Sequence, residues 1–180
     1  MTKVSISRIV ICLLLYITIP SYAALGEAPI TLYGTLTAQG CDVSPESANQ
    51  NIRIGDFSVS DYKTAGTVSP AADLYITITG CTATPYAQVY FSGESDDNDP
   101  ELLKLSGDTQ NGNTAVGIAV QILDGNTLAE IPLNQQSSTW TQVSTKSDTQ
   151  YHYKLRYKST RADVKSGNAA AVLYFDVIYK

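Results

Sequence analysis

Apolar and more polar residues alternate along most of the chain after residue 29. Successive side chains of a β-strand point to opposite faces, so this alternation predicts strands with one buried face. Threonine, tyrosine, valine and isoleucine, which favour strands, dominate these runs. The clearest runs cover residues 30–36, 74–78, 88–91, 116–123 and 151–157.

Turn-forming residues separate these runs at short intervals. No long stretch carries a helical period, and no repeat or linker divides the sequence in two. Many short strands joined by turns predict an all-β fold, either a sandwich or a barrel. The turn signals are Ser44-Pro45, Thr84-Pro85, Asp124-Gly125-Asn126 and Ser166-Gly167-Asn168.

The N-terminus has the order of a secretory signal peptide. Lys3 and Arg8 precede an apolar run over residues 9–19, which is followed by a proline and by two small residues flanking a tyrosine. This order predicts that residues 1–23 are a signal peptide, removed on export. An uncleaved membrane anchor is the alternative, although a spanning helix needs about 20 apolar residues.

Removal of the signal leaves 180 − 23 = 157 residues, enough for one domain with one core. The signal holds two of the 12 basic residues and none of the 17 acidic ones, so the remaining formal charge is 10 − 17 = −7. Such an acidic chain lacks the basic surface that binds nucleic acid, and we expect no nucleic-acid partner.

Two cysteines remain after signal removal, Cys41 and Cys81, because Cys12 lies in the signal. An even number in an exported chain predicts one disulfide. A bond across 81 − 41 = 40 residues stabilises a fold by about 4 kcal/mol in the chain-entropy view. A metal-binding or redox pair is the alternative, but the sequence has no CxxC motif and a single histidine.

Catalytic chemistry finds little support in the sequence. The single histidine, His152, alternates with Tyr151 and Tyr153, which places it on the opposite, solvent-facing side of its strand. No G-x-S-x-G turn, phosphate loop or metal-ligand cluster is found. We therefore predict that the chain is not an enzyme, has no catalytic or metal-binding residues and needs no cofactor.

Two further features have alternative interpretations. The acidic, turn-rich stretch 92–100 is predicted to be a solvated loop, although its aspartates also suggest calcium. Their spacing lacks the glycine and the terminal glutamate of a calcium loop. Trp140 and the tyrosines are interpreted as core or sandwich-rim residues, with a sugar-binding platform as the alternative.

Both ends of the remaining chain are apolar, alternating runs. A C-terminal strand of this kind, if it lies on a sheet edge, exposes backbone groups that pair with other chains. The run 30–36 lies just before Cys41 and is a candidate for insertion into a groove elsewhere. Pattern alone nevertheless favours a closed sandwich, in which the two terminal strands pair within one molecule. The residues on one face of the C-terminal run are Ala171, Leu173, Phe175, Val177 and Tyr179.

Several motifs follow one another in a fixed order along the chain. In this order they resemble the type 1 fimbrial subunits assembled by the chaperone–usher pathway, and most closely their minor, adaptor-type members. The resemblance covers essentially the whole chain after the signal. The motifs are the run 30–34 followed by Gly40-Cys41, the run 76–80 ending at Cys81, the segments 120–124 and 131–134, Gly167 fourteenth from the end, and Tyr179 next to last.

The resemblance implies an incomplete immunoglobulin-like β-sandwich over residues 38–180, preceded by a donor-strand extension over residues 24–37. The sandwich lacks its final strand, which leaves an apolar groove. A neighbouring subunit's extension fills that groove by β-strand addition, a mode of recognition for which pilin assembly is a known example. Aliphatic donor residues point into the groove, and a glycine marks the position where it has no room for a side chain. The implied donor residues are Ile30, Leu32, Gly34 and Leu36.

The resemblance also implies partners and a cellular location. The chain becomes a structural subunit of a fimbrium on the cell surface, exported through the periplasm, and contributes to cell adhesion. Its partners are other pilus subunits, an outer-membrane usher and a periplasmic chaperone, whose basic residues grip the carboxylate of Lys180. A closed secreted sandwich that binds a sugar or host protein, as an adhesin does, is the alternative. The implied chaperone and groove-strand residues are Gly167, Leu173, Phe175, Val177 and Tyr179.

Overall fold

The computed structural model describes residues 40–83, 85–106 and 114–180. The expected signal peptide 1–23 and donor strand 24–37 lie outside the described residues. The domain boundaries stay predictions for that reason. The same holds for the donor residues Ile30, Leu32, Gly34 and Leu36.

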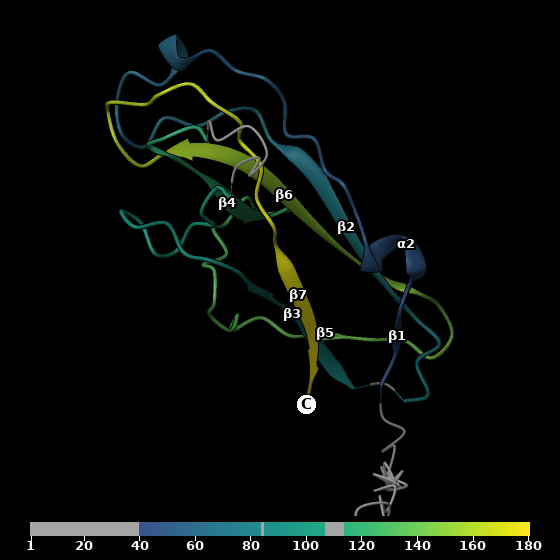
Figure 1. The fold of residues 1–180 in the computed structure, drawn as a ribbon. Coiled ribbons are helices and arrows are strands. Elements are labelled where there is room, and N and C mark those ends of the chain that lie inside the picture. Colours follow the sequence, from purple (N-terminus) through teal and green to yellow (C-terminus); the bar gives the residue numbers. More distant parts are fainter. Residues whose placement is uncertain (1–39, 84, 107–113) are drawn as a thin grey trace, which may run out of the picture. The chain divides into compact units, whose positions relative to one another are not determined.

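Two antiparallel sheets form the described part of the chain (Figure 1). The first has the order β1-β2-β6-β4 and the second the order β5-β3-β7, which confirms the predicted all-β sandwich. Within the described ranges, no helix has the length and apolar character needed to cross a membrane. The strands are β1 (Asp42–Val43), β2 (Ala72–Thr79), β3 (Tyr86–Ser92), β4 (Ile118–Asp124), β5 (Thr141–Gln142), β6 (Thr149–Ser159) and β7 (Tyr174–Tyr179); the helical turns are α2 (Pro45–Ala48) and η1 (Val59–Asp61).

β6 lies at the centre of the first sheet, between β2 and β4. Tyr75 of β2 lies opposite His152. Burial alternates from one residue to the next along β6, as the period of two predicts. The buried face of β6 consists of Tyr151, Tyr153, Leu155, Tyr157 and Ser159.

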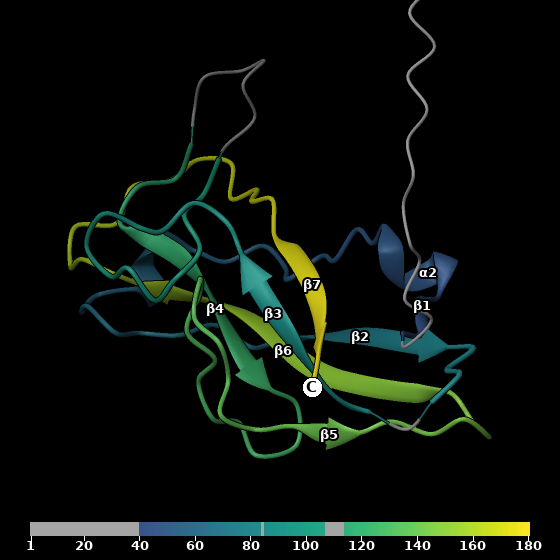
Figure 2. The same ribbon diagram turned by 90° about the horizontal axis from the view of Figure 1, so that it is seen from below.

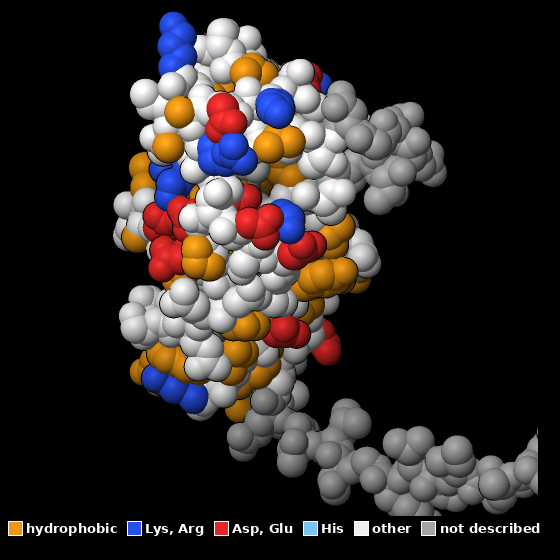
Figure 3. Space-filling view, turned by 60° about the vertical axis from the view of Figure 1, so that its left-hand side comes forward, with side chains coloured by type: hydrophobic (Ala, Val, Ile, Leu, Met, Phe, Trp, Pro, Cys, Tyr) orange, Lys and Arg blue, Asp and Glu red, His pale blue; other side chains and the backbone are white. Residues whose placement is uncertain are grey.

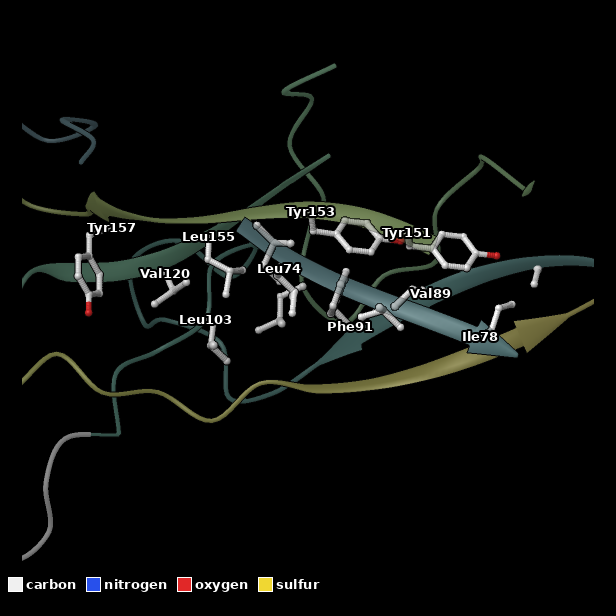
Figure 4. Packing of buried hydrophobic residues seen from close by; sticks show 14 of the residues in the cluster. Leu74, Ile78, Val89, Phe91, Leu103, Val120, Tyr151, Tyr153, Leu155 and Tyr157 are labelled. Atoms are coloured by element: carbon white, nitrogen blue, oxygen red, sulfur yellow. The ribbon is translucent and has the colours of Figure 1, made fainter. Parts of the chain in front are cut away.

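Apolar side chains from both sheets meet between them (Figure 4). Phe91 of β3 meets Tyr153 of β6 edge to face, with ring centroids 4.8 Å apart. Ile76 and Ile78 of β2 are completely buried. Burial of one such aliphatic side chain contributes about 1.5–3 kcal/mol, so this interior is the main source of the domain's stability.

A disulfide joins Cys41 to Cys81, as predicted. Cys41 directly precedes β1, and Cys81 follows shortly after β2, the strand with which β1 pairs. The bond therefore holds the first described residues of the domain against the end of β2.

Two element boundaries differ from the sequence-based expectations. The predicted Ser44-Pro45 turn instead begins α2, where Ser44 Oγ accepts a hydrogen bond from the Ser47 N–H (3.3 Å). Proline suits the first helical position because its missing N–H has no partner there in any case. The C-terminal strand begins at Tyr174 rather than near residue 170, since the Ala170 carbonyl accepts a hydrogen bond from the Ser106 N–H (2.9 Å) instead of joining the sheet.

Candidate strand-binding groove

One side of the sandwich is closed by backbone hydrogen bonds. Leu103 and Val120 of β4 each donate an N–H to the other's carbonyl, at 2.9 and 2.9 Å. After β4 the chain crosses to the second sheet, where the Asn134 N–H donates to the Phe91 carbonyl (2.9 Å). The loops before and after β4 therefore cover this side.

The acidic stretch 92–100 belongs to the loop before β4 and is partly exposed, as predicted. Lys104 Nζ lies 2.9 Å from Glu94 Oε1 and 3.3 Å from Asp97 Oδ1. Acidic and basic side chains lie next to one another on the face drawn in Figure 3. In the part of the chain that the structure describes, no group of three or more acidic, histidine or cysteine side chains is placed to hold a metal ion.

On the opposite side of the sandwich, no strand among the described residues covers the interior. A groove of about 1760 Å³ runs there between the extended segment 49–57 and β7, together with the residues that precede β7. The floor of this groove is the apolar interior itself. Core side chains that reach it include Leu74, Phe91, Leu103, Val120 and Leu155.

β7 forms one wall of the groove. Among the described strands it pairs with β3 alone and so lies at the edge of its sheet (Figure 2). Tyr86 and Lys180 exchange both backbone hydrogen bonds, at 3.2 and 2.9 Å. Because such pairs alternate in an antiparallel ladder, Phe175, Val177 and Tyr179 turn their own N–H and C=O groups away from β3. Their side chains pack against the core but stay only partly buried. This edge thus presents free backbone groups beside an incompletely covered interior.

The segment 49–57 forms the other wall. Among the described residues, no backbone–backbone hydrogen bond involves this segment. Ile52 and Ile54 pack against the core and are partly buried, while Phe57 meets Tyr157 edge to face at 6.0 Å. The edge of β2 is occupied instead by the side chains of Ser47, which accepts from the Thr77 N–H (2.9 Å), and Gln50, which donates to the Tyr75 carbonyl (2.7 Å). The groove therefore has unpaired backbone on both sides.

The groove is bounded at one end by Tyr179. Its hydroxyl donates to the Cys41 carbonyl and accepts from the Cys41 N–H, both at 3.2 Å. Toward the other end, the Tyr157 hydroxyl donates to the Ala169 carbonyl (2.7 Å). These hydrogen bonds connect the C-terminal part of the chain to the first sheet near both ends of the groove.

The ionisable hydroxyl of Tyr157 is among the groups that line the groove. Burial raises the pKa of the Tyr157 hydroxyl, with smaller contributions from Tyr62 and Asp56. Burial likewise raises the pKa of Tyr151, a core residue outside the groove lining, to about 12. Tyr157 therefore stays neutral at physiological pH, which suits an apolar, uncharged occupant of the groove.

The groove contains three of the predicted groove-strand residues. Gly167, Leu173 and Phe175 line it. Val177 and Tyr179 lie further along β7 and pack, partly buried, against the core. The contacts of these residues with a chaperone stay predictions. Sequence reasoning missed the opposite wall, although the alternation of Ile52 and Ile54 with polar residues was a signal for it.

His152 lies on the outer face of the first sheet, as predicted. Its Nε2 is 2.7 Å from Asp73 Oδ1, and its ring stacks on Tyr75 with centroids 4.6 Å apart. Lys154 and, to a smaller extent, His152 hydrogen-bond the Asp73 carboxylate and hold its pKa below the usual range. The histidine is thus part of a hydrogen-bonded cluster on the surface, together with Asp73 and Lys154.

The fold and the groove define the class of protein: an immunoglobulin-like, pilin-type sandwich with one side open. A family model described as fimbrial protein matches residues 30–180. The chain therefore belongs to the fimbrial protein family, a family of structural subunits.

Known proteins agree with this assignment. The chain is 52% identical to the uncharacterized fimbrial-like protein YcbU of Escherichia coli (strain K12), over 86% of this chain and 85% of that one. It is 27% identical to the fimbrial subunit type 1 of Salmonella typhimurium, over 89% and 87% of the two chains. Its fold resembles that of the P pilus rod subunit PapA, with a TM-score of 0.64 and 23% identity over 78% of this chain and 99% of that one.

Proposed function

We propose that this fimbrial subunit polymerises by donor-strand complementation. Its open groove accepts an extended strand from another polypeptide, and its own residues 24–37 enter the groove of the next subunit. The observation that carries the proposal is the free edge of β7. There the unpaired backbone of Phe175, Val177 and Tyr179 borders partly covered core side chains, opposite a second unpaired segment.

A strand placed in the groove gains both kinds of interaction that the groove leaves open. Its backbone pairs with the free edge, and its apolar side chains cover the floor. Burying three aliphatic side chains contributes very roughly 5–9 kcal/mol. The sequence supplies three at alternate or near-alternate positions, Ile30, Leu32 and Leu36, with Gly34 for the tightest point.

The same open edge explains why other partners are needed. An unpaired apolar edge promotes aggregation, so the subunit requires protection before assembly. We assign that role to a periplasmic chaperone that lends a strand to the groove, and we assign transfer to the fibre to an outer-membrane usher. Export through the periplasm follows from the signal peptide expected over residues 1–23.

Strand exchange with a peptide tests this function. The chain is exported together with a periplasmic pilus chaperone, the complex is purified, and a synthetic peptide matching residues 27–40 is added. We expect the peptide to displace the chaperone and to remain bound to the subunit. Retention of the chaperone at every peptide concentration contradicts donor-strand complementation.

Variant peptides give the matched controls. An Ile30→Asp or Leu32→Asp peptide puts a charge against the apolar floor, and we expect no displacement from it. A Gly34→Leu peptide adds a side chain at the tightest point, and its displacement rate should fall. Displacement by the aspartate peptides at the unmodified rate contradicts the assigned orientation of the donor side chains.

A further inference from the structure

Backbone pairing along the outer edge of β2 stops early. Among the described residues, β1 pairs with β2 at Thr79 and Ile78. One residue further along, the Ser44 N–H still donates to the Thr77 carbonyl (2.9 Å). The chain then turns into α2, which lies beside β2 (Figure 1). A regular ladder would instead have continued along the rest of β2.

Two side chains bond the edge of β2 where the backbone pairing ends. The buried Ser47 accepts the Thr77 N–H on its Oγ (2.9 Å), so both backbone groups of Thr77 are satisfied. Gln50 Nε2 donates to the Tyr75 carbonyl (2.7 Å) and to the Ser47 carbonyl in α2 (3.3 Å). Gln50 therefore ties the end of α2 to the edge of β2.

These contacts affect the segment 49–57, which follows α2. An edge strand with free N–H and C=O groups is a template for pairing with any extended segment beside it. On β2, however, the groups of Thr77 and the carbonyl of Tyr75 are already bonded to side chains. The segment 49–57 accordingly has no backbone–backbone hydrogen bond over the ranges that the structure describes.

The segment 49–57 nevertheless has the side-chain pattern of a strand. Ile52 and Ile54 are partly buried against the core, whereas Asn51 and Arg53 between and beside them are exposed. This alternation from one residue to the next is that of a strand with one buried face. All these residues line the groove. The segment is thus prepared for pairing on the groove side and is held away from pairing with β2.

We propose that Ser47 and Gln50 are positioning residues for strand uptake. By bonding the edge of β2, they hold the segment 49–57 out of the first sheet and leave its backbone free for the strand that enters the groove. The inference rests on the proposed function, because that strand is the donor strand. It adds that the donor strand pairs with this segment as well as with β7, and it names the side chains that keep the segment available.

The test combines Ser47→Ala with Gln50→Met in the full chain, co-exported with the chaperone. Methionine keeps the length of the glutamine side chain but has no N–H donor, and alanine removes the hydroxyl. The segment 49–57 can then pair with β2. One hydrogen bond shifts an equilibrium about two- to tenfold. We therefore expect the 27–40 peptide to bind about tenfold more weakly, because only the fraction of subunits with the segment free takes it up fully.

Gln150→Met is the matched control. It makes the same exchange on β6, where the glutamine Nε2 donates to the side-chain hydroxyl of Thr77 (3.2 Å) and not to a backbone group. Because the backbone edge of β2 stays bonded, the peptide should displace the chaperone from this variant at the same concentrations as from the unmodified chain.

A second readout separates positioning from a general loss of stability. Nuclear Overhauser contacts of the isotope-labelled subunit report which backbone lies beside residues 51–55. In the unmodified subunit these residues should contact the bound peptide, as β7 does. In the double variant we expect their contacts to move to β2, while the contacts between β7 and the peptide remain. A subunit that is merely less stable gains no contacts between residues 51–55 and β2.

The outcomes distinguish this inference from the proposed function. Unchanged peptide binding by the double variant overturns the positioning role, and so does weaker binding without new contacts to β2. Should the double variant not be recovered, Gln50→Met alone, at an exposed side chain, decides by the same two readouts. A peptide that contacts β7 but not residues 51–55 of the unmodified subunit overturns the inference and leaves the proposed function intact. Failure of the peptide to displace the chaperone from the unmodified chain contradicts the proposed function instead.

Discussion

Tyr179 links the two sheets at the end of the groove through a single hydroxyl. It belongs to β7 of the second sheet, whereas both of its hydrogen bonds go to the backbone of Cys41, beside β1 of the first. Cys41 is in turn fixed to the end of β2 by the disulfide. The resemblance singled out both residues, but it did not predict their contact.

Tyr179→Phe should keep the ring in place and remove both hydrogen bonds. Each is worth about 0.5–1.5 kcal/mol, so we expect the free energy of unfolding to fall by about 1–3 kcal/mol. Urea denaturation of the subunit occupied by the 27–40 peptide measures the change. The control is Tyr174→Phe, because Tyr174 is 63% exposed. Equal urea midpoints for Tyr179→Phe and the unmodified subunit show that the hydroxyl does not hold the sheets together.

The groove walls are two elements of different kinds. β7 is a regular edge strand, and its free backbone groups follow from its register with β3. The segment 49–57 is extended but outside any sheet. A strand bound between them completes one ladder on β7 and gives the unpaired segment a neighbour.

Strand positions were predictable from the sequence wherever one face is buried. The period of two located β2 and β6 because their inward residues pack against the opposite sheet. The segment 49–57 escaped notice because its alternation is short and no ladder fixes it. The closure beside β4 depends on backbone hydrogen bonds such as those between Leu103 and Val120. These residues are separated in the sequence, so the local pattern of apolar and polar residues did not predict the closure.

Ile54→Asp tests the contribution of the segment 49–57. Ile54 packs against the core beside the groove, so a carboxylate there disfavours an apolar strand. We expect slower and weaker uptake of the 27–40 peptide. The matched control is the neighbouring Arg53→Ser, because Arg53 is exposed and its ion pair with Asp56 is a surface contact. Equal loss of uptake in both variants contradicts a specific role for the inward face of this segment.

The whole domain is a sandwich closed on one side and open on the other. Backbone bonds from the flanking loops seal the β4 side, whereas the β7 side exposes core residues in a groove. The alternative given by the sequence, a sandwich closed on both sides, agrees with the structure only on the β4 side. An adaptor position within the fibre stays a prediction from the sequence.

A chain that begins at residue 38 tests the open sandwich at this scale. Exported without a chaperone or peptide, it cannot fill the groove, and we expect aggregates or degradation rather than a monomer. Co-export with the chaperone should restore a soluble complex on size-exclusion chromatography. A stable solitary monomer of the shortened chain contradicts the need for a borrowed strand.

The contacts of Cys41 have a mechanical consequence in a fibre built in this way. Tension reaches each subunit through the chain that leads into Cys41 and departs through the strand held on β7. Cys41 carries both the disulfide to Cys81 and the hydrogen bonds to the Tyr179 hydroxyl. A force on Cys41 is therefore transmitted to the first sheet and to β7 at the same time. A filament under flow therefore carries its load across the sandwich of every subunit, and no sheet has to peel open before the force reaches the next one.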